Sequence, residues 1–395
     1  MTTSLPRQDR IRRALELLRN ETTDKFDEVI DFAPTEFTDP VLAQDERDHI
    51  FGTVPSIVAH SSELAKPNDF MTVQMPRNNL IVTRQKDGSI KAFVNLCRHR
   101  GAMLEEREKG RCRIFSCPYH RWSYDPDGSL RTITRDTTFG EVDRAEHGLI
   151  EVPVQERHGF VWVVDNANAT IDVEAWLGPE MDAILAEYRL EDAVCYQAGG
   201  FDEPTNWKLM QDAFLDGYHI QYAHPNTAGK VIHTNVMALE DFGRHCRFIA
   251  PRKSIDRFLE EDPGDAALDK YVTETHFLLP NSTLLRQPDH FQLLTFRPHP
   301  SDPAQSRMEQ RLIVPKVEDS GMDEAHWERL WSKNWDILLA VLHNEDFPLL
   351  RGSQRGMASA DAGDMMLGRN EIANQVFRRE TRRLVADGRA AAAAK

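Results

Sequence analysis

Short apolar runs separated by turn residues characterise the first half of the chain after its N-terminal segment. Residues 80–83 and 90–94 are such runs, and Asp87-Gly88 between them is typical of a β-hairpin turn. Residues 160–164 form another apolar run and predict a further strand. This spacing of short strands and turns predicts a small β-rich unit.

Helical spacing of apolar residues occurs in three other places. Near the N-terminus these residues are Ile11, Ala14, Leu15, Leu17 and Leu18. Residues 207–215 and 327–342 also have helical spacing, and the second segment predicts a long helix with one apolar face. Between them, residues 283–285, 291–296 and 310–314 predict successive strands of a second sheet.

Composition narrows the class of protein. At 395 residues the chain exceeds the usual size of one domain, so we expect two. The formal net charge of −15 argues against binding to nucleic acid or to an anionic membrane surface. No apolar run reaches the length of a membrane span, and the N-terminus lacks the apolar core of a secretory signal. Five cysteines without a disulfide framework fit a cytoplasmic protein.

Two cysteine–histidine pairs provide the strongest chemical signal. Cys97 and His99 form a Cys-x-His pair, and after seventeen intervening residues Cys117 and His120 form a Cys-x-x-His pair. A Rieske [2Fe–2S] cluster uses two cysteines on one iron and two histidines on the other. A structural zinc site is the alternative, but zinc fingers usually keep Cys with Cys and His with His. The pattern therefore predicts a Rieske cluster.

A second histidine pair follows about a hundred residues later. Asp216 and His219 are three residues apart, so on a helix the carboxylate can hold the imidazole in one orientation. His224 is five residues beyond His219 and would point to a different side of a regular helix. Pro225 disfavours helical backbone at His224, which lets that side chain turn back towards His219.

Two histidines need a third protein ligand to form the two-His-one-carboxylate site of non-haem iron. Carboxylates are available in the segment His343-Asn344-Glu345-Asp346, which follows the long apolar-faced helix. The spacing of residues leaves Glu345, Asp346 and Asp216 all open as this ligand.

Together these motifs resemble the α-subunits of Rieske non-haem iron oxygenases, the aromatic ring-hydroxylating oxygenase family. The resemblance extends from about Asp48 to Gly356. It is carried by Cys97-x-His99, Cys117-x-x-His120, Asn206-Trp207-Lys208, Asp216-x-x-His219-x4-His224, and Asp346 with Gln354 eight residues later.

The resemblance implies an α+β fold with a small all-β Rieske [2Fe–2S] domain. A larger helix-grip (START-like) catalytic domain with an antiparallel sheet would follow it. We expect an N-terminal helical lead over residues 1–45, the Rieske domain over 46–165 and the catalytic mononuclear-iron domain over 166–395.

By the same resemblance, Cys97, His99, Cys117 and His120 bind the cluster. His219, His224 and Asp346 would bind a mononuclear Fe(II), with Glu345 as the less favoured third ligand. Asp216 would be an inter-subunit electron-transfer bridge from His219 to the cluster ligand His120 of a neighbouring chain. The family's arrangement implies a homotrimer (α3), with or without a small β-subunit.

The expected function is that of a terminal oxygenase component. It would use O2 and electrons from NAD(P)H to hydroxylate an aromatic or alicyclic small-molecule substrate, by ring dihydroxylation or monooxygenation. No dinucleotide or flavin fingerprint is present, so we expect a separate reductase, with or without a ferredoxin. The alternatives are a Rieske monooxygenase that removes N- or O-methyl groups, a pure electron carrier, and a small-molecule-binding protein.

One departure from the family pattern concerns the helix before His219. Many family members have Glu-Asn where this chain has Gln211-Asp212. We expect the Asp212 carboxylate to lie on the helix near the iron, and we interpret the change as a tolerated variation.

Overall fold

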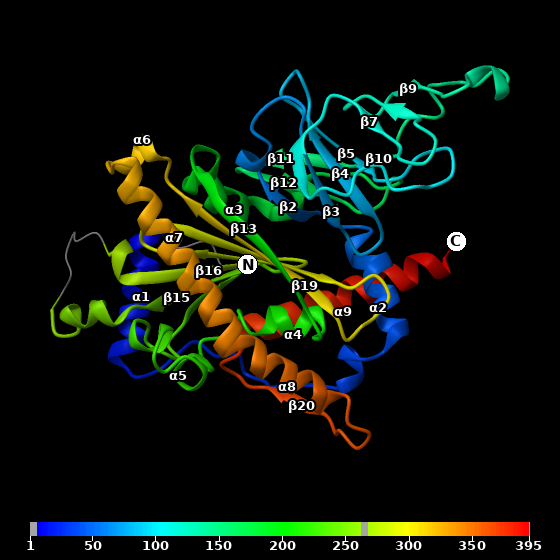
Figure 1. Ribbon diagram of the computed structural model, residues 1–395. Helices are drawn as coiled ribbons and strands as arrows, with labels where there is room; N and C mark the ends of the chain where they lie inside the picture. Colours follow the sequence, from blue (N-terminus) through cyan, green and yellow to red (C-terminus); the bar gives the residue numbers. More distant parts are fainter. Residues whose placement is uncertain (1–5, 262–267, 395) are drawn as a thin grey trace.

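The computed structural model of the protein describes residues 6–261 and 268–394. The unit at the upper right of Figure 1 is built mainly from short strands, and the rest is one large sheet with helices around it. Within the described residues, helices and antiparallel sheets are both abundant, which confirms the predicted α+β class.

The small unit contains three sheets. The first has the order β10-β5-β4-β3-β6, the second β11-β12-β2, and the third β7-β8-β9. The strands are β2 (Ser56–His60), β3 (Asp69–Gln74), β4 (Asn79–Arg84), β5 (Ile90–Val94), β6 (Lys109–Arg111), β7 (Phe115–Ser116), β8 (Ser123–Tyr124), β9 (Leu130–Thr132), β10 (Glu151–Val152), β11 (Val154–Arg157) and β12 (Phe160–Val163). The predicted β4–β5 hairpin and the strand at β12 are confirmed.

The large unit is built on a seven-stranded antiparallel sheet with the order β13-β19-β18-β17-β16-β15-β14. These strands are β13 (Val194–Glu203), β14 (Ala238–Asp241), β15 (Cys246–Pro251), β16 (Val272–Leu278), β17 (Ser282–Arg286), β18 (Phe291–Pro298) and β19 (Ser306–Val314). The three strands predicted between residues 283 and 314 are therefore confirmed as β17, β18 and β19.

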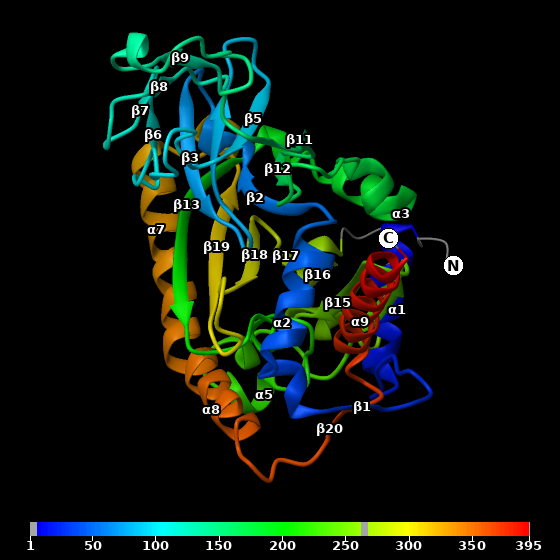
Figure 2. The same ribbon diagram turned by 90° about the vertical axis from the view of Figure 1, so that its right-hand side faces the viewer.

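Helices cover the two faces of this sheet (Figures 1 and 2). They are α1 (Arg7–Arg19), α2 (Pro40–Glu46), α3 (Val173–Tyr188), α4 (Trp207–Asp212), α5 (Ile220–Ala223), α6 (Val317–Ser320), α7 (Glu324–Val341), α8 (Phe347–Met357) and α9 (Ile372–Ala393). The predicted helices near the N-terminus and over 327–342 are confirmed as α1 and α7. The short strands β1 (Ile30–Phe32) and β20 (Met365–Leu367) pair and join the two ends of the chain.

The register of the strands sorts their side chains onto two faces. On one face, Leu284 and Leu293 pack with Met181 of α3. On the other face, Leu294 and Phe296 pack with residues of α4 and α8 in a separate apolar cluster. Since cross-strand partners point to the same side of a sheet, every side chain of β15–β19 can be assigned to the α3 face or the α4 face.

Charge is divided unequally between these faces. The charged side chains of β15–β19 all lie on the α3 face: Arg247, Glu274, Arg286, Arg297, Arg307, Glu309 and Arg311. The polar side chains of these strands on the α4 face are neutral: Thr273, Thr275, Thr283, Gln292, Ser306 and Gln310. These five strands therefore present an uncharged wall to α4, whereas the outer strands place Glu203 of β13 and Asp241 of β14 on the same face.

Candidate metal centres

The two cysteine–histidine arms fold into the same turn. The N–H of Cys97 donates to the carbonyl of Ala102, and the N–H of Cys117 donates to the carbonyl of Trp122. The fourth residue after each cysteine has a positive φ, +74° at Gly101 and +60° at Arg121. Two copies of one turn thus present the four predicted ligands together at the top of the small unit.

The four side chains converge from these loops. Both cysteines are free and buried, and their thiols interact with each other. The rings of His99 and His120 lie 4.5 Å apart, centroid to centroid. Trp122 stacks on His99 with an angle of 10° between the planes and fixes that ring.

The unpaired atoms of this group fit a [2Fe–2S] cluster. The Nδ1 atoms of His99 and His120 are buried and have no hydrogen-bond partner. An unpaired buried nitrogen costs about 1–3 kcal/mol unless something binds it. Burial also raises the pKa of the Cys97 thiol, so a thiolate there needs a nearby cation. Two iron atoms would satisfy both requirements.

The second candidate centre lies at a break in the predicted helix. The structure forms α4 and α5 with turns between them, so the helix predicted over residues 207–215 is only partly confirmed. The Asp216 side chain accepts a hydrogen bond from the backbone N–H of His219, which favours a local turn over continued helix. As predicted from Pro225, His224 leaves the helical conformation, with φ −120° and ψ 44°.

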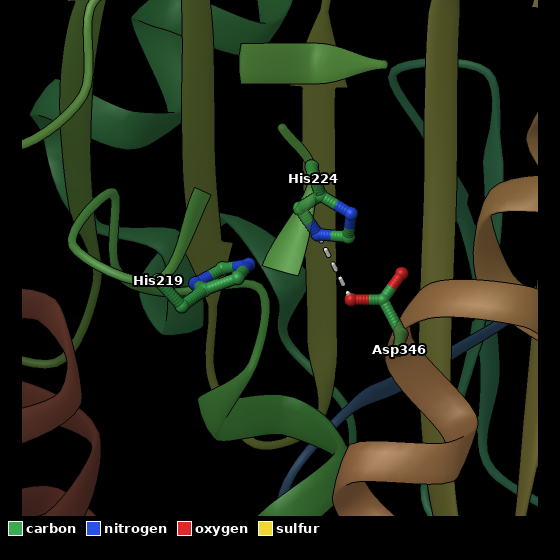
Figure 3. Close-up of side chains that lie close together, drawn as sticks. All are labelled: His219, His224 and Asp346. Carbon is green, nitrogen blue, oxygen red and sulfur yellow. Dashed lines mark ion pairs between the residues drawn. The ribbon is translucent and has the colours of Figure 1, made fainter. Parts of the chain in front are cut away.

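Three side chains meet at this break (Figure 3). His219, His224 and Asp346 each offer one ligand atom, and these atoms lie within 4.8 Å of one another. Nε2 of His224 is 3.2 Å from Oδ1 of Asp346, and the two imidazole rings are 5.2 Å apart. His224 and Asp346 are buried and His219 is half-buried. This donor set fits a non-haem iron.

A carboxylate also contacts the Nδ1 atom of each histidine. Nδ1 of His219 lies 3.1 Å from both oxygens of Asp216. Nδ1 of His224 lies 2.6 Å from Oε2 of Glu345. Burial opposes a charge on His224, but Asp346 and Glu345 outweigh it and raise its pKa. The surroundings of His224 therefore favour a cation.

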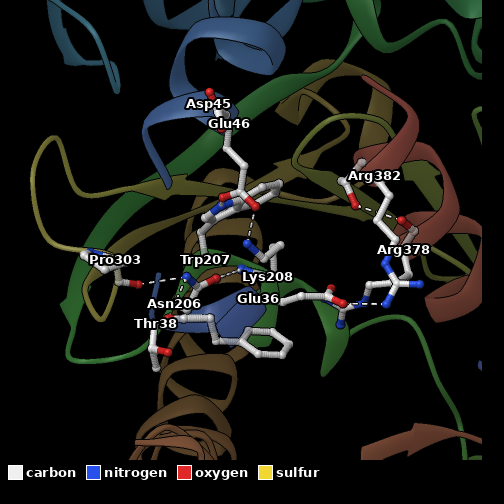
Figure 4. A network of polar contacts seen from close by, with 12 residues as sticks. Glu36, Thr38, Asp45, Glu46, Asn206, Trp207, Lys208, Pro303, Arg378 and Arg382 are labelled. Carbon is white, nitrogen blue, oxygen red and sulfur yellow. Dashed lines mark hydrogen bonds and ion pairs between the residues drawn. The ribbon is translucent and has the colours of Figure 1, made fainter. Parts of the chain in front are cut away.

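A buried polar network fixes α4 beside this centre (Figure 4). Lys208 forms an ion pair with Glu46, and Nε1 of Trp207 donates to the same carboxylate at 2.9 Å. The backbone N–H of Asn206 donates to Oε1 of Gln354 at 2.8 Å, which ties α4 to α8. The motif Asn206-Trp207-Lys208 thus anchors the element that precedes the histidines. Its partner Glu46 carried no signal in the sequence.

The Asp212 side chain contacts the C-terminal helix α9. Its carboxylate accepts a 2.5 Å hydrogen bond from the guanidinium of Arg378. Nδ2 of Asn374 donates to the backbone carbonyl of Asp212 at 2.8 Å. Both partners belong to α9, so this side chain links α4 to the C-terminal helix.

Comparison with known proteins supports both centres. Residues 186–387 match the family described as the ring hydroxylating alpha subunit (catalytic domain). Residues 55–144 match the Rieske [2Fe-2S] domain. The predicted type of cluster is therefore confirmed, whereas the individual ligand assignments stay predictions.

Curated relatives include oxygenases of two kinds. The chain is 34% identical over 218 residues to the anthranilate 1,2-dioxygenase large subunit of Acinetobacter baylyi, covering 52% of this chain and 46% of that one. It is 33% identical over 197 residues to the carnitine monooxygenase oxygenase subunit of Escherichia coli K12, covering 49% and 52%. The chain thus spans about half the length of the curated relatives it matches.

A solved structure extends the similarity of fold to nearly the whole chain. It is a quaternary ammonium Rieske monooxygenase, reported with carnitine oxidation and inter-subunit electron transfer. The TM-score is 0.73 at 21% identity, and the match covers 98% of this chain and 100% of that one. No helix among the described residues is both long and apolar enough to cross a membrane.

Proposed function

Because the chain belongs to the family of ring-hydroxylating oxygenase α-subunits, as its motifs predicted, we propose that it is a terminal oxygenase component. It would use O2 and electrons from NAD(P)H, delivered by a separate reductase with or without a ferredoxin, to hydroxylate a small organic substrate. One observation carries the proposal: a single chain brings together a Cys2His2 group and a separate His2Asp group. A pure electron carrier would need only the first.

In this proposal, Cys97, His99, Cys117 and His120 hold the [2Fe–2S] cluster. His219, His224 and Asp346 hold the mononuclear iron. When bound, these groups supply single electrons and the activation of O2. The protein positions the ligands, buries the site and orients the imidazoles. We also retain the division into a lead (1–45), a Rieske domain (46–165) and a catalytic domain (166–395), with a cytoplasmic location.

The distance between the centres favours electron transfer between subunits. The cluster loops lie beside β7 and β8 at the top of Figures 1 and 2, whereas α5 and α8 lie near the bottom. A second copy can bring its cluster close to His219, and Asp216 already contacts that ring. Exposed aromatic side chains at both ends suit such an interface: Tyr119, Tyr218 and Tyr222. This supports a homotrimer (α3) in which Asp216 is the inter-subunit bridge.

The uncharged wall formed by β15–β19 gives information about the class of substrate. Gln211 of α4 donates to Thr283 of β17, so α4 and the neutral face of the sheet meet next to the histidine segment. In β15–β19 this face has no carboxylate that could pair with a quaternary ammonium group. We therefore favour hydroxylation of a weakly polar aromatic or alicyclic compound. Demethylation is the alternative, since one relative is a carnitine monooxygenase.

The test begins with the metals. Protein purified without air should contain about three irons per chain, two in the cluster and one alone. A surrogate reductase and NADH should then drive O2 uptake that depends on substrate. The panel should pair neutral aromatic compounds with carnitine and betaine, with products identified by mass spectrometry. Two irons per chain and no substrate-dependent O2 uptake would contradict the proposal.

A further inference from the structure

Glu345 directly precedes the proposed iron ligand Asp346 but contacts a different atom of the same histidine. Its Oε2 lies 2.6 Å from Nδ1 of His224. The hydroxyl of Thr227 donates to the same oxygen, also at 2.6 Å. Asp346 instead faces Nε2, on the opposite edge of the ring. The carboxylates of Glu345 and Asp346 therefore contact the two nitrogens of one imidazole ring.

The local backbone explains how neighbouring residues can do this. Helices α7 and α8 are joined through a π-helical turn, η9 (Leu342–Asp346). A π-turn closes its hydrogen bonds over five residues and is wider than an α-helical turn, so consecutive side chains diverge less in direction. Glu345 and Asp346 lie at the end of this turn, and their side chains reach Nδ1 and Nε2 of His224, respectively.

We propose that Glu345 is a positioning residue for the mononuclear metal, an inference that rests on the proposed function. By accepting a hydrogen bond from Nδ1, it keeps His224 in the tautomer whose Nε2 lone pair is free. Its Oε2 already receives two hydrogen bonds, and it lies across the ring from Nε2. Glu345 is thus the support of a ligand, and Asp346 is the ligand.

The same device serves the other histidine. Asp216 holds Nδ1 of His219 from three residues away, within one turn of chain. Glu345 holds Nδ1 of His224 from a segment 121 residues away. The first contact can form locally, whereas the second requires the α7–η9–α8 segment to dock on α5. Glu345 therefore couples correct packing of that segment to the geometry of the metal site.

The test measures metal affinity rather than turnover. Protein that retains its cluster but lacks the mononuclear metal is titrated with Co(II) without air, and the ligand-field bands are recorded. Glu345→Ala should weaken Co(II) binding about 10–100-fold and alter the bands. Glu345→Gln, which keeps an acceptor oxygen, should restore part of the affinity. Thr227→Val should cause a smaller loss.

Two variants make the outcome decisive. Asp336→Asn removes an exposed carboxylate from α7 and should match wild type. Asp346→Ala should lose Co(II) binding. Wild-type affinity and bands in Glu345→Ala would overturn the positioning role of Glu345. They would leave the proposed function standing, because the site would still bind metal. Retained binding in Asp346→Ala with loss in Glu345→Gln would make Glu345 the ligand. No Co(II) binding in wild type would instead overturn the proposed function.

Discussion

At the residue scale, both centres contain histidine nitrogens in positions that a metal ion would suit. Nδ1 of His99 and of His120 is buried without a hydrogen bond. Nε2 of His224 faces the Asp346 carboxylate, an arrangement that favours a cation or a proton between the two atoms. An iron atom would satisfy both arrangements, so binding of iron should stabilise the fold.

The first prediction concerns Asp346. Replacing it with alanine removes one of the three proposed iron ligands but touches none of the four proposed cluster ligands. We expect loss of the single iron, unchanged cluster content and at least a 100-fold fall in turnover. Iron analysis and the spectrum of the reduced cluster check this together. Full mononuclear iron in the variant would show that the third ligand is another residue.

The second prediction concerns Asp216. Asp216→Ala should leave about three irons per chain but abolish steady-state turnover, because the proposed bridge to the neighbouring cluster would be lost. The exposed Asp361→Ala provides a matched control and should behave as wild type. Rapid-mixing measurements should find a cluster that is reduced normally but not reoxidised by O2 and substrate. Normal turnover in Asp216→Ala would rule out the bridging role.

Sequence reasoning identified the proposed ligands more readily than the residues that support them. Cys97 and His219 stand in short motifs with a fixed spacing, and such motifs are visible in one dimension. Thr227 and Glu46 have ordinary sequence surroundings, and their roles arise from contacts with residues more than a hundred positions away. The spacing also left Glu345 and Asp346 equivalent, because the π-turn that directs them to different atoms of His224 is set by packing.

At the scale of elements, α4 is too short to be stable by itself and depends on its buried partners. The third prediction tests the strongest of these. Lys208→Met leaves Glu46 buried beside Trp207 without its cation, which should lower the free energy of unfolding by about 3–5 kcal/mol. Denaturant unfolding measures the change, and the exposed Lys333→Met should have little effect.

A double substitution sharpens that test. In Glu46→Leu/Lys208→Met both charges are absent, so part of the lost stability should return. If the double variant were as unstable as the sum of the two single variants, the ion pair would not be the cause.

Element prediction failed where side chains compete with the helical backbone. The apolar spacing from Trp207 to Leu215 suggested a continuous helix, yet α4 ends at Asp212. Spacing reports which face is buried, but it does not register that the Asp216 carboxylate binds the N–H of His219 and closes a turn. The strands were easier, because β17–β19 combine apolar runs with clear turns.

At the scale of the molecule, two arginines of the large sheet clamp the small unit. Arg311 donates to the carbonyl of Val58 at 2.7 Å, and Arg297 donates to that of Ile57 at 3.3 Å. Glu309 lies between both guanidinium groups, at 2.6 Å from Arg297 and 3.0 Å from Arg311. Because β2 belongs to the small unit, this cluster fixes how the two units dock.

The fourth prediction follows from the charge of Glu309. Burial alone would raise its pKa, but Arg297 and Arg311 lower it from 4.5 to about 2. A lowered carboxylate pKa stabilises the folded state above the unfolded pKa, and this contribution is lost as pH falls from about 4.5 towards 2. Its size is on the order of 3 kcal/mol at neutral pH.

Glu309→Gln should therefore be less stable than wild type at pH 7, with a gap that narrows below about pH 4.5. Thermal unfolding across this pH range provides the measurement. Glu187→Gln, at an exposed position of α3, should keep a small and constant gap. A gap for Glu309→Gln that does not change with pH would contradict the predicted titration.

The separation of charged and neutral faces in the large sheet has an evolutionary consequence. Within β15–β19 the ion pairs lie on the α3 face, whereas the threonines and glutamines lie on the α4 face and take no part in them. Residues such as Thr275 and Gln310 can therefore be exchanged to admit new compounds without disturbing the scaffold. Saturation libraries confined to the α4 face should yield a high proportion of folded proteins with altered substrate preference. The same scaffold could then accept many different substrates.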